Sequence, residues 1–110
     1  MNLIVHIGQG KTGSSSIQKT LRNSQNILRN HNYEYTGLNF ELAPKKIFEW
    51  QKAGSWELLR TSNDAPKQLA HVIHENIKHL RKKNITKVIW SNESLFASPE
   101  LVIPALKAVQ

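Results

Sequence analysis

The sequence predicts an α/β protein in which helices cover a parallel β-sheet. Two short runs, residues 3–7, which only His6 interrupts, and residues 85–90, are mostly apolar or β-branched and suit buried strands, the first of them buried on both faces. Segments in which apolar residues recur at helical spacing lie between and after these runs, and such alternation favours parallel pairing of the strands. At 110 residues, the chain has room for a single domain with a modest core.

The first helix is predicted over residues 14–30. Ile17, Leu21 and Leu28 recur on one side of this helix, and we expect that side to pack on the sheet. Residues 33–36 alternate between polar and aromatic or apolar character, which is typical of a short second strand.

The second half of the chain predicts further helices around the last strand. Residues 39–62 indicate one or two short helices, and Pro44 can open the first of them. A clear amphipathic helix starts at the polar run 62–66, ends near Lys83, and is followed by Asn84, which tolerates a left-handed turn. The apolar side of this helix consists of Leu69, Val72, Ile73, Ile77 and Leu80. A final helix is predicted from the Ser-Pro-Glu signal at residues 98–100 to residue 108.

A glycine-rich segment between the first strand and the first helix predicts an anion-binding loop. Residues 3–18 read LIVHIGQGKTGSSSIQ. Backbone N–H groups of such a loop and of the first helical turn converge on an anion, and the helix macrodipole adds positive potential. Lys11 adds an ammonium group, and the serine hydroxyl groups add hydrogen-bond donors. The predicted ligand-binding residues are Gly8, Gly10, Lys11, Thr12, Gly13, Ser14, Ser15 and Ser16.

The position of the lysine separates this loop from the nucleotide-hydrolase loop G-x-x-x-x-G-K-[ST]. Gly8 and Gly13 have the required separation, but Ser14 stands where that motif has its lysine, and Lys11 lies inside the loop. The order Lys-Thr-Gly-Ser-Ser-Ser resembles the 5′-phosphosulfate loop of sulfotransferases, K-x-G-[ST]-[ST]-[ST]. The longer string HIGQGKTGSSSIQ looks like bacterial sulfotransferases related to the carbohydrate and heparan sulfate enzymes.

The resemblance implies a P-loop three-layer fold, with the second strand beside the first. It also implies a sulfonyl transfer from 3′-phosphoadenosine 5′-phosphosulfate to a hydroxyl or amine of an acceptor, such as a carbohydrate or glycolipid, without a metal ion. Sulfotransferase domains are usually well over twice this long, so we expect residues 1–110 to form a single partial, truncated sulfotransferase domain. The arginine and serine that hold the 3′-phosphate in the family have no match, since no arginine follows Arg81. This departure predicts weak donor binding or an inactive chain.

A carboxylate after the last strand is the predicted catalytic base. The run VIWSNES resembles the hydrophobic strand followed by Ser-Ser-Glu in several bacterial sulfotransferases. If the two strands are parallel neighbours, Glu93 lies near the Lys11 loop and can act as the base or orient the acceptor. Its alternative role is that of a loop or helix-capping carboxylate. Lys11 would stabilise the charge on the leaving phosphate. Glu34 and Glu41 are weaker candidates for the base, and His6 fits a core histidine.

The net charge of +7 favours anionic partners, such as a donor nucleotide, an acidic glycan, nucleic acid or an anionic membrane surface. The absence of cysteine excludes disulfides, thiolate zinc sites and a cysteine nucleophile. No apolar run approaches 18 residues and no basic segment precedes the first one, so we expect a cytoplasmic protein without a transmembrane segment.

A polar and basic stretch on the long helix has two interpretations. The order of His71, His74, Glu75 and His79 resembles the zinc motif H-E-x-x-H, but Lys78 breaks it, so we expect a solvated face and no metal. The densest basic run consists of Lys78, His79, Arg81, Lys82 and Lys83. Such a run is either a solvated helix end or a contact for an acidic glycan or nucleic acid. No interleaved aromatic residues or known motif support nucleic acid, which is therefore not expected as a partner.

Two other classes of function stay open. A P-loop nucleotide-binding protein or kinase would require Mg²⁺ and a lysine after Gly13, which the chain lacks. A basic binding module, or an inactive sulfotransferase remnant, is favoured by the short length and by the missing 3′-phosphate motif.

Overall fold

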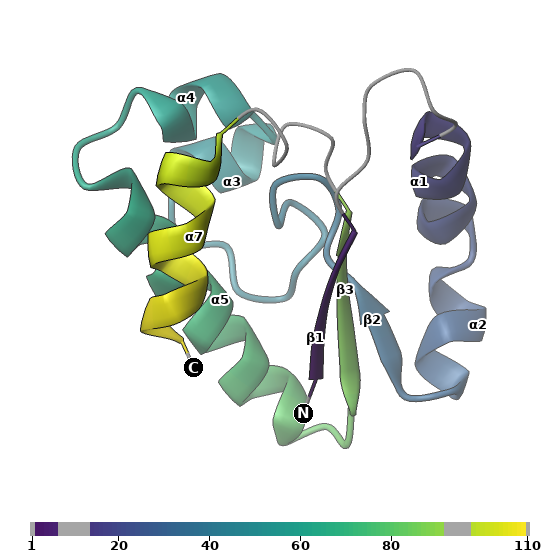
Figure 1. The fold of residues 1–110 in the computed structure, drawn as a ribbon. Helices are drawn as coiled ribbons and strands as arrows, with labels where there is room; N and C mark the ends of the chain where they lie inside the picture. Colours follow the sequence, from purple (N-terminus) through teal and green to yellow (C-terminus); the bar gives the residue numbers. More distant parts are fainter. Residues whose placement is uncertain (1, 7–13, 92–97, 110) are drawn as a thin grey trace.

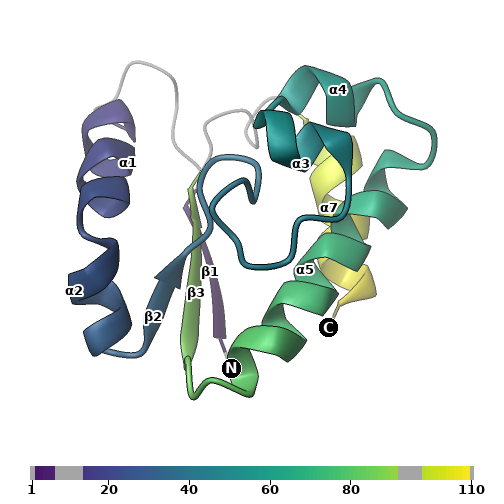
Figure 2. The same cartoon turned by 180° about the vertical axis from the view of Figure 1, so that it is seen from behind.

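The computed structural model describes residues 2–6, 14–91 and 98–109. They form an α/β domain with a three-stranded parallel sheet and, within these ranges, six helices. The strands are β1 Asn2–His6, β2 Tyr33–Tyr35 and β3 Lys87–Ser91. The helices are α1 Ser14–Asn23, α2 Gln25–Asn30, α3 Glu49–Ala53, α4 Trp56–Arg60, α5 Ala65–Arg81 and α7 Pro99–Ala108. Figures 1 and 2 show α1 and α2 on one side of the sheet and the other four helices on the opposite side.

The strand order is β1-β3-β2, and both neighbouring pairs are parallel. The expected strand beside the first is therefore not β2, because β2 pairs with β3 at the far edge. Val88 and Trp90 of β3 are fully buried, as a central strand requires. The neighbour that the resemblance implied for the second strand is wrong, whereas the predicted parallel α/β architecture is confirmed.

The main core lies between the sheet and the helices α3, α4, α5 and α7. Trp90 packs on Phe40 with ring centroids 5.0 Å apart, and the predicted apolar side of α5 supplies much of the remaining surface. The buried members of this core are Phe40, Ala43, Trp50, Leu59, Ala65, Leu69, Val72, Ile73, Trp90, Leu101, Val102 and Ala105. The apolar spacing of α5 and the Ser-Pro-Glu start signal of α7 predicted both helices correctly.

The layer on the other side of the sheet differs from the prediction. The helix expected over residues 14–30 is broken at Ser24, so α1 and α2 are separate. Ile17, expected to face the sheet, is 46% exposed, whereas Gln18 is buried. Ile4 of β1 is 40% exposed, because α2 contacts β2 at the opposite edge of the sheet and leaves this side of β1 open. The expectation that β1 is buried on both faces is therefore wrong.

Polar side chains hold the long connection between β2 and α3. Pro44 does not open a helix, and α3 begins only at Glu49. The buried amide of Gln51 donates to the carbonyls of Phe40 and Lys45 and accepts from the Ile47 N–H. These bonds satisfy backbone groups that a helix would otherwise pair internally.

Further details of the second half agree with the sequence. The left-handed turn predicted after the long helix occurs at Asn84, whose φ is 64°. α5 is the longest described helix, at 17 residues. None of the helices in the described ranges is long and apolar enough to cross a membrane.

Candidate functional site at the carboxyl edge of the sheet

The carboxyl ends of the three parallel strands meet at one edge of the sheet. β1 and β3 end together, since His6 lies opposite Ser91 in their register. Beyond the end of β2, the Thr36 N–H donates to the Ile89 carbonyl at 3.1 Å, and its hydroxyl donates to the same oxygen at 3.2 Å. Segment 7–13 follows β1 and segment 92–97 follows β3. Segments 7–13 and 92–97 therefore follow neighbouring strands. Ligands of open α/β sheets bind at the edge formed by the carboxyl ends of the strands.

Most of the sequence-predicted site residues belong to the segments of the chain that follow β1 and β3. Gly8, Gly10, Lys11, Thr12, Gly13 and Glu93 lie outside the described residues. Ser14, Ser15 and Ser16 form the first turn of α1. The structure therefore establishes the strand before the glycine-rich segment and the helix after it, and the roles of the loop residues and of Glu93 stay predictions.

Gln18 fixes α1 against the end of the central strand. Its side-chain amide is buried and donates to the Ser91 carbonyl at 3.4 Å. Ser91 is itself fully buried. This contact joins α1 to Ser91, the last residue of β3.

An ion pair joins α1 to the turn that follows β2. The guanidinium of Arg22, on α1, lies 3.2 Å from the Glu41 carboxylate. The same carboxylate accepts backbone N–H bonds from Leu38 at 2.7 Å and Asn39 at 2.9 Å. Gly37 lies beside it with φ of 84°, a conformation that favours glycine. Glu41 therefore ties the turn after β2 to α1.

The carboxylate of Glu34 also has a structural partner. Glu34 is buried on β2 and accepts two parallel hydrogen bonds from the Arg29 guanidinium, each 3.0 Å long. The hydrogen bonds with Glu34 raise the pKa of Arg29, and their charge attraction adds to the effect while burial opposes it. This bidentate ion pair joins α2 to β2. Both weaker base candidates are thus engaged in structural bonds.

Among the described residues, the histidines of α5 do not assemble a metal site with neighbouring acids. In the part of the chain that the structure describes, no group of three or more histidine, aspartate or glutamate side chains is arranged to hold a metal ion. His71 instead contacts the Phe48 ring edge-on, with ring centroids 6.3 Å apart.

Sequence reasoning missed Gln18 and Arg22 as positioning residues. Their spacing of four places both on one side of α1, but only apolar residues were used to find the side that faces the sheet. A polar pair at this spacing just after a predicted strand-to-helix loop is a usable signal, because strand ends present carbonyl groups that require donors.

No protein-family model, curated protein or solved structure matches this chain. The assignment of function therefore depends on its own residues and their geometry.

Proposed function

We propose that this chain is a P-loop sulfotransferase, which binds 3′-phosphoadenosine 5′-phosphosulfate at the carboxyl edge of the sheet. The observation that carries the proposal is the parallel pairing of β1 with β3, in which His6 lies opposite Ser91. The glycine-rich segment follows β1, and α1 begins directly after it. Strand, glycine-rich segment and helix thus occur in the order that an anion-binding loop requires.

The positive potential in this proposal comes from Lys11 and from the start of α1. The helix has ten residues and no acidic residue in its first turn. Its first backbone N–H groups have no carbonyl partner within the helix, so they can donate to phosphate or sulfate oxygens. The glycines allow close approach of the backbone, and the hydroxyl groups of Thr12 and of the three serines supply further donors.

The proposed reaction is an in-line displacement at sulfur. The oxygen or nitrogen of a carbohydrate or glycolipid acceptor forms a bond to sulfur, while the bond from sulfur to the bridging oxygen of the 5′-phosphate breaks. Glu93 takes the acceptor proton, and Lys11 stabilises the negative charge that grows on the bridging oxygen. The products are the sulfated acceptor and adenosine 3′,5′-bisphosphate, and no metal ion takes part.

The hydrogen bonds of Glu34 and Glu41, the other two candidates for the base, support Glu93 as the base. Glu34 is bonded to Arg29 in two places, and Glu41 is bonded to Arg22 and to two backbone N–H groups. Proton uptake by either carboxylate would weaken bonds that hold the fold together. Glu93 follows β3, the direct neighbour of β1.

Calorimetric titration with adenosine 3′,5′-bisphosphate, beside ADP with Mg²⁺, tests the donor site. We expect tighter binding of the bisphosphate, and Lys11→Ala should weaken that binding about tenfold or more, which corresponds to about 1.4 kcal/mol. Lys19→Ala removes an equal charge from an exposed position on α1 and should change the affinity less than about twofold.

The other outcomes separate the alternatives. Tighter binding of ADP with Mg²⁺ would assign the chain to the P-loop nucleotide-binding proteins or kinases. Binding of neither nucleotide would reject the donor site and leave a basic binding module or an inactive remnant. If the bisphosphate binds, release of bisphosphate from the sulfonate donor in the presence of saccharide acceptors tests turnover. Glu93→Gln should then retain nucleotide binding and lose turnover.

A further inference from the structure

A second cationic region lies at the other end of the sheet. The second half of α5 and the two residues after it carry six basic side chains and one carboxylate, that of Glu75. The six basic side chains and Lys45, which lies next to them, form the basic surface. Its members are Lys45, His74, Lys78, His79, Arg81, Lys82 and Lys83. α5 ends at Arg81, shortly before β3 starts at Lys87, so this surface lies near the amino ends of the strands. Figure 1 shows the end of α5 beside the starts of the strands, away from the first turn of α1.

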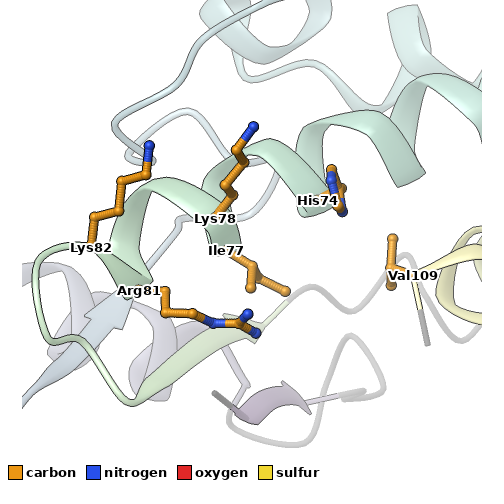
Figure 3. A pocket seen from close by; sticks show the side chains of 6 residues that line it. All are labelled: His74, Ile77, Lys78, Arg81, Lys82 and Val109. Atoms are coloured by element: carbon orange, nitrogen blue, oxygen red, sulfur yellow. The ribbon is translucent and has the colours of Figure 1, made fainter.

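The basic surface surrounds a hollow of about 350 Å³ between α5 and the end of α7. Ile77 and Val109 give the hollow an apolar part, and Lys78, Arg81 and Lys82 supply the charge. Figure 3 shows the ammonium groups of Lys78 and Lys82 directed to one side of α5, whereas Ile77 and the Arg81 guanidinium lie on the other side. Apolar and cationic side chains that line one hollow suit a ring that carries anionic substituents.

A smaller hollow of about 160 Å³ adjoins the first and shares Lys78 and Lys82 with it. Lys45 lines this second hollow although it comes from the connection before α3. Asn76, fully buried on α5, holds the Lys45 backbone: its amide oxygen accepts the Lys45 N–H at 2.9 Å, and its amide nitrogen donates to the Lys45 carbonyl at 3.1 Å. A buried side chain thus brings a cation from another segment to the two hollows.

The cations of the basic surface outnumber the carboxylates near them: within the described ranges, Glu75 is the one carboxylate that lines either hollow, where it lies beside Lys45 and Lys78. None of the lysines of the basic surface, nor Arg81, forms an ion pair with a carboxylate in those ranges. Burial first, and then the charges of Lys83, Lys45 and Lys82, lower the pKa of His79. Cations in the last turn of a helix are favoured by its dipole, but this does not account for Lys45. A concentration of like charges drawn from two segments indicates an anionic partner.

We propose that the basic surface binds an acidic polysaccharide that carries sulfate or carboxylate groups. The two hollows form a path along α5 in which sugar rings lie on the apolar part and their anionic groups meet the lysines. This proposal does not rest on the proposed transferase activity, because none of the residues of the basic surface belongs to the donor site.

The geometry favours a saccharide over nucleic acid. α5 packs on the core with one side and on α7 with another, so it is not a free helix that could enter a major groove. No phenylalanine, tyrosine or tryptophan side chain lines either of the two hollows in the described residues, whereas single-stranded nucleic acid binds by stacking on aromatic rings.

Titration of the full chain with dextran sulfate, and with uncharged dextran of equal length, tests this proposal. We expect binding of dextran sulfate alone, weakened about tenfold by Lys78→Gln/Lys82→Gln, because fewer cations at the polymer release fewer of its counterions. Lys19→Gln/Lys67→Gln removes the same net charge from exposed positions elsewhere and should change binding less than about twofold. Equal weakening by both double variants would overturn the proposal.

Competition between anionic polymers shows which class of partner the basic surface prefers. Carboxymethyl dextran distinguishes carboxylate from sulfate recognition, and tighter binding of either polymer than of a duplex DNA of equal charge supports the proposal. Tighter binding of the duplex, or of phosphatidylserine vesicles, would contradict it. Bound polysaccharide should also raise the pKa of His79 in an NMR titration, and Lys11→Ala should leave this binding unchanged, which separates it from the donor site.

Discussion

Substitution of Gly37, in the turn after β2, tests whether the hydrogen bonds of Glu41 stabilise this turn. Gly37 and Gly54 both have positive φ, 84° and 62°. A methyl group at Gly37 would collide with the Glu41 carboxylate, whereas one at Gly54 would meet the Glu41 Cγ at 3.6 Å, an ordinary contact distance. Gly54→Ala is therefore a matched control that carries the backbone strain without the collision.

The expected losses of stability differ by about 2 kcal/mol. Each alanine introduces left-handed strain of about 1–2 kcal/mol, offset by about 0.4–1 kcal/mol from the less flexible unfolded chain. This leaves about 1 kcal/mol for Gly54→Ala. In Gly37→Ala the Glu41 side chain, 16% exposed, must move away from the backbone N–H groups of Leu38 and Asn39. Loss of these charge-assisted bonds adds about 2 kcal/mol, for a total of about 3 kcal/mol.

Urea unfolding followed by tryptophan fluorescence measures both losses. The decisive comparison is Gly37→Ala in a Glu41→Ala background, where the collision is absent. We expect the cost of Gly37→Ala to fall there to that of Gly54→Ala, which gives a coupling of about 2 kcal/mol. Equal costs of the two glycine substitutions in the native background, or an extra cost that survives removal of Glu41, would refute the reasoning.

Three further substitutions test other contacts. Asn76→Leu should lower the free energy of unfolding by about 2 kcal/mol, because it leaves the Lys45 N–H without its acceptor; a loss below about 0.5 kcal/mol in urea would show that water replaces the amide. Trp90→Phe removes the indole N–H that donates to the Leu38 carbonyl at 2.8 Å and should cost about 2 kcal/mol, measured by thermal unfolding in circular dichroism. The lowered pKa of His79 means that the unfolded chain takes up this proton first, so its contribution to stability is complete above about pH 6.5 and is lost as the pH falls through the folded pKa. His79→Gln should flatten this part of the stability profile, and an unchanged profile would contradict the assignment.

The elements that the sequence predicted well are those whose signal is local. α5 repeats its apolar residues at helical spacing, and β3 contains the apolar and β-branched run Val-Ile-Trp; each pattern is complete within its own segment. The neighbour of β2 could not be read in this way, because strand pairing joins distant segments. The break at Ser24 was missed since the helical spacing continues across it, although serine and the asparagines beside it disfavour a helix interior.

The candidate site was predictable only as an arrangement of segments. The motif predicted a strand before the glycine-rich segment and a helix after it, and both are present. The contact of Gln18 with Ser91 depends on the rotation of α1 about its own axis. Ile17 was predicted to face the sheet, but Ile17 is exposed and Gln18 is buried, so the predicted rotation of the helix was wrong. The bonds of Glu41 depend on the left-handed turn at Gly37, whose geometry the spacing of residues alone does not specify.

The distribution of compensated charge separates the two ends of the sheet. On the layer of α1 and α2, the arginines meet buried or half-buried carboxylates: Arg22 pairs with Glu41 and Arg29 with Glu34. These ion pairs hold helices to strands. Because each pair contains one positive and one negative charge, the pairs add nothing to the net charge of +7. Along the second half of α5 the cations have no such partners among the described residues, so this surface carries a large part of the excess charge. A ligand attracted by the net charge alone would therefore reach α5, whereas a ligand at the carboxyl edge requires the specific donors of the glycine-rich segment. Salt dependence distinguishes the two: binding at α5 should weaken steeply with ionic strength, and nucleotide binding at the carboxyl edge much less.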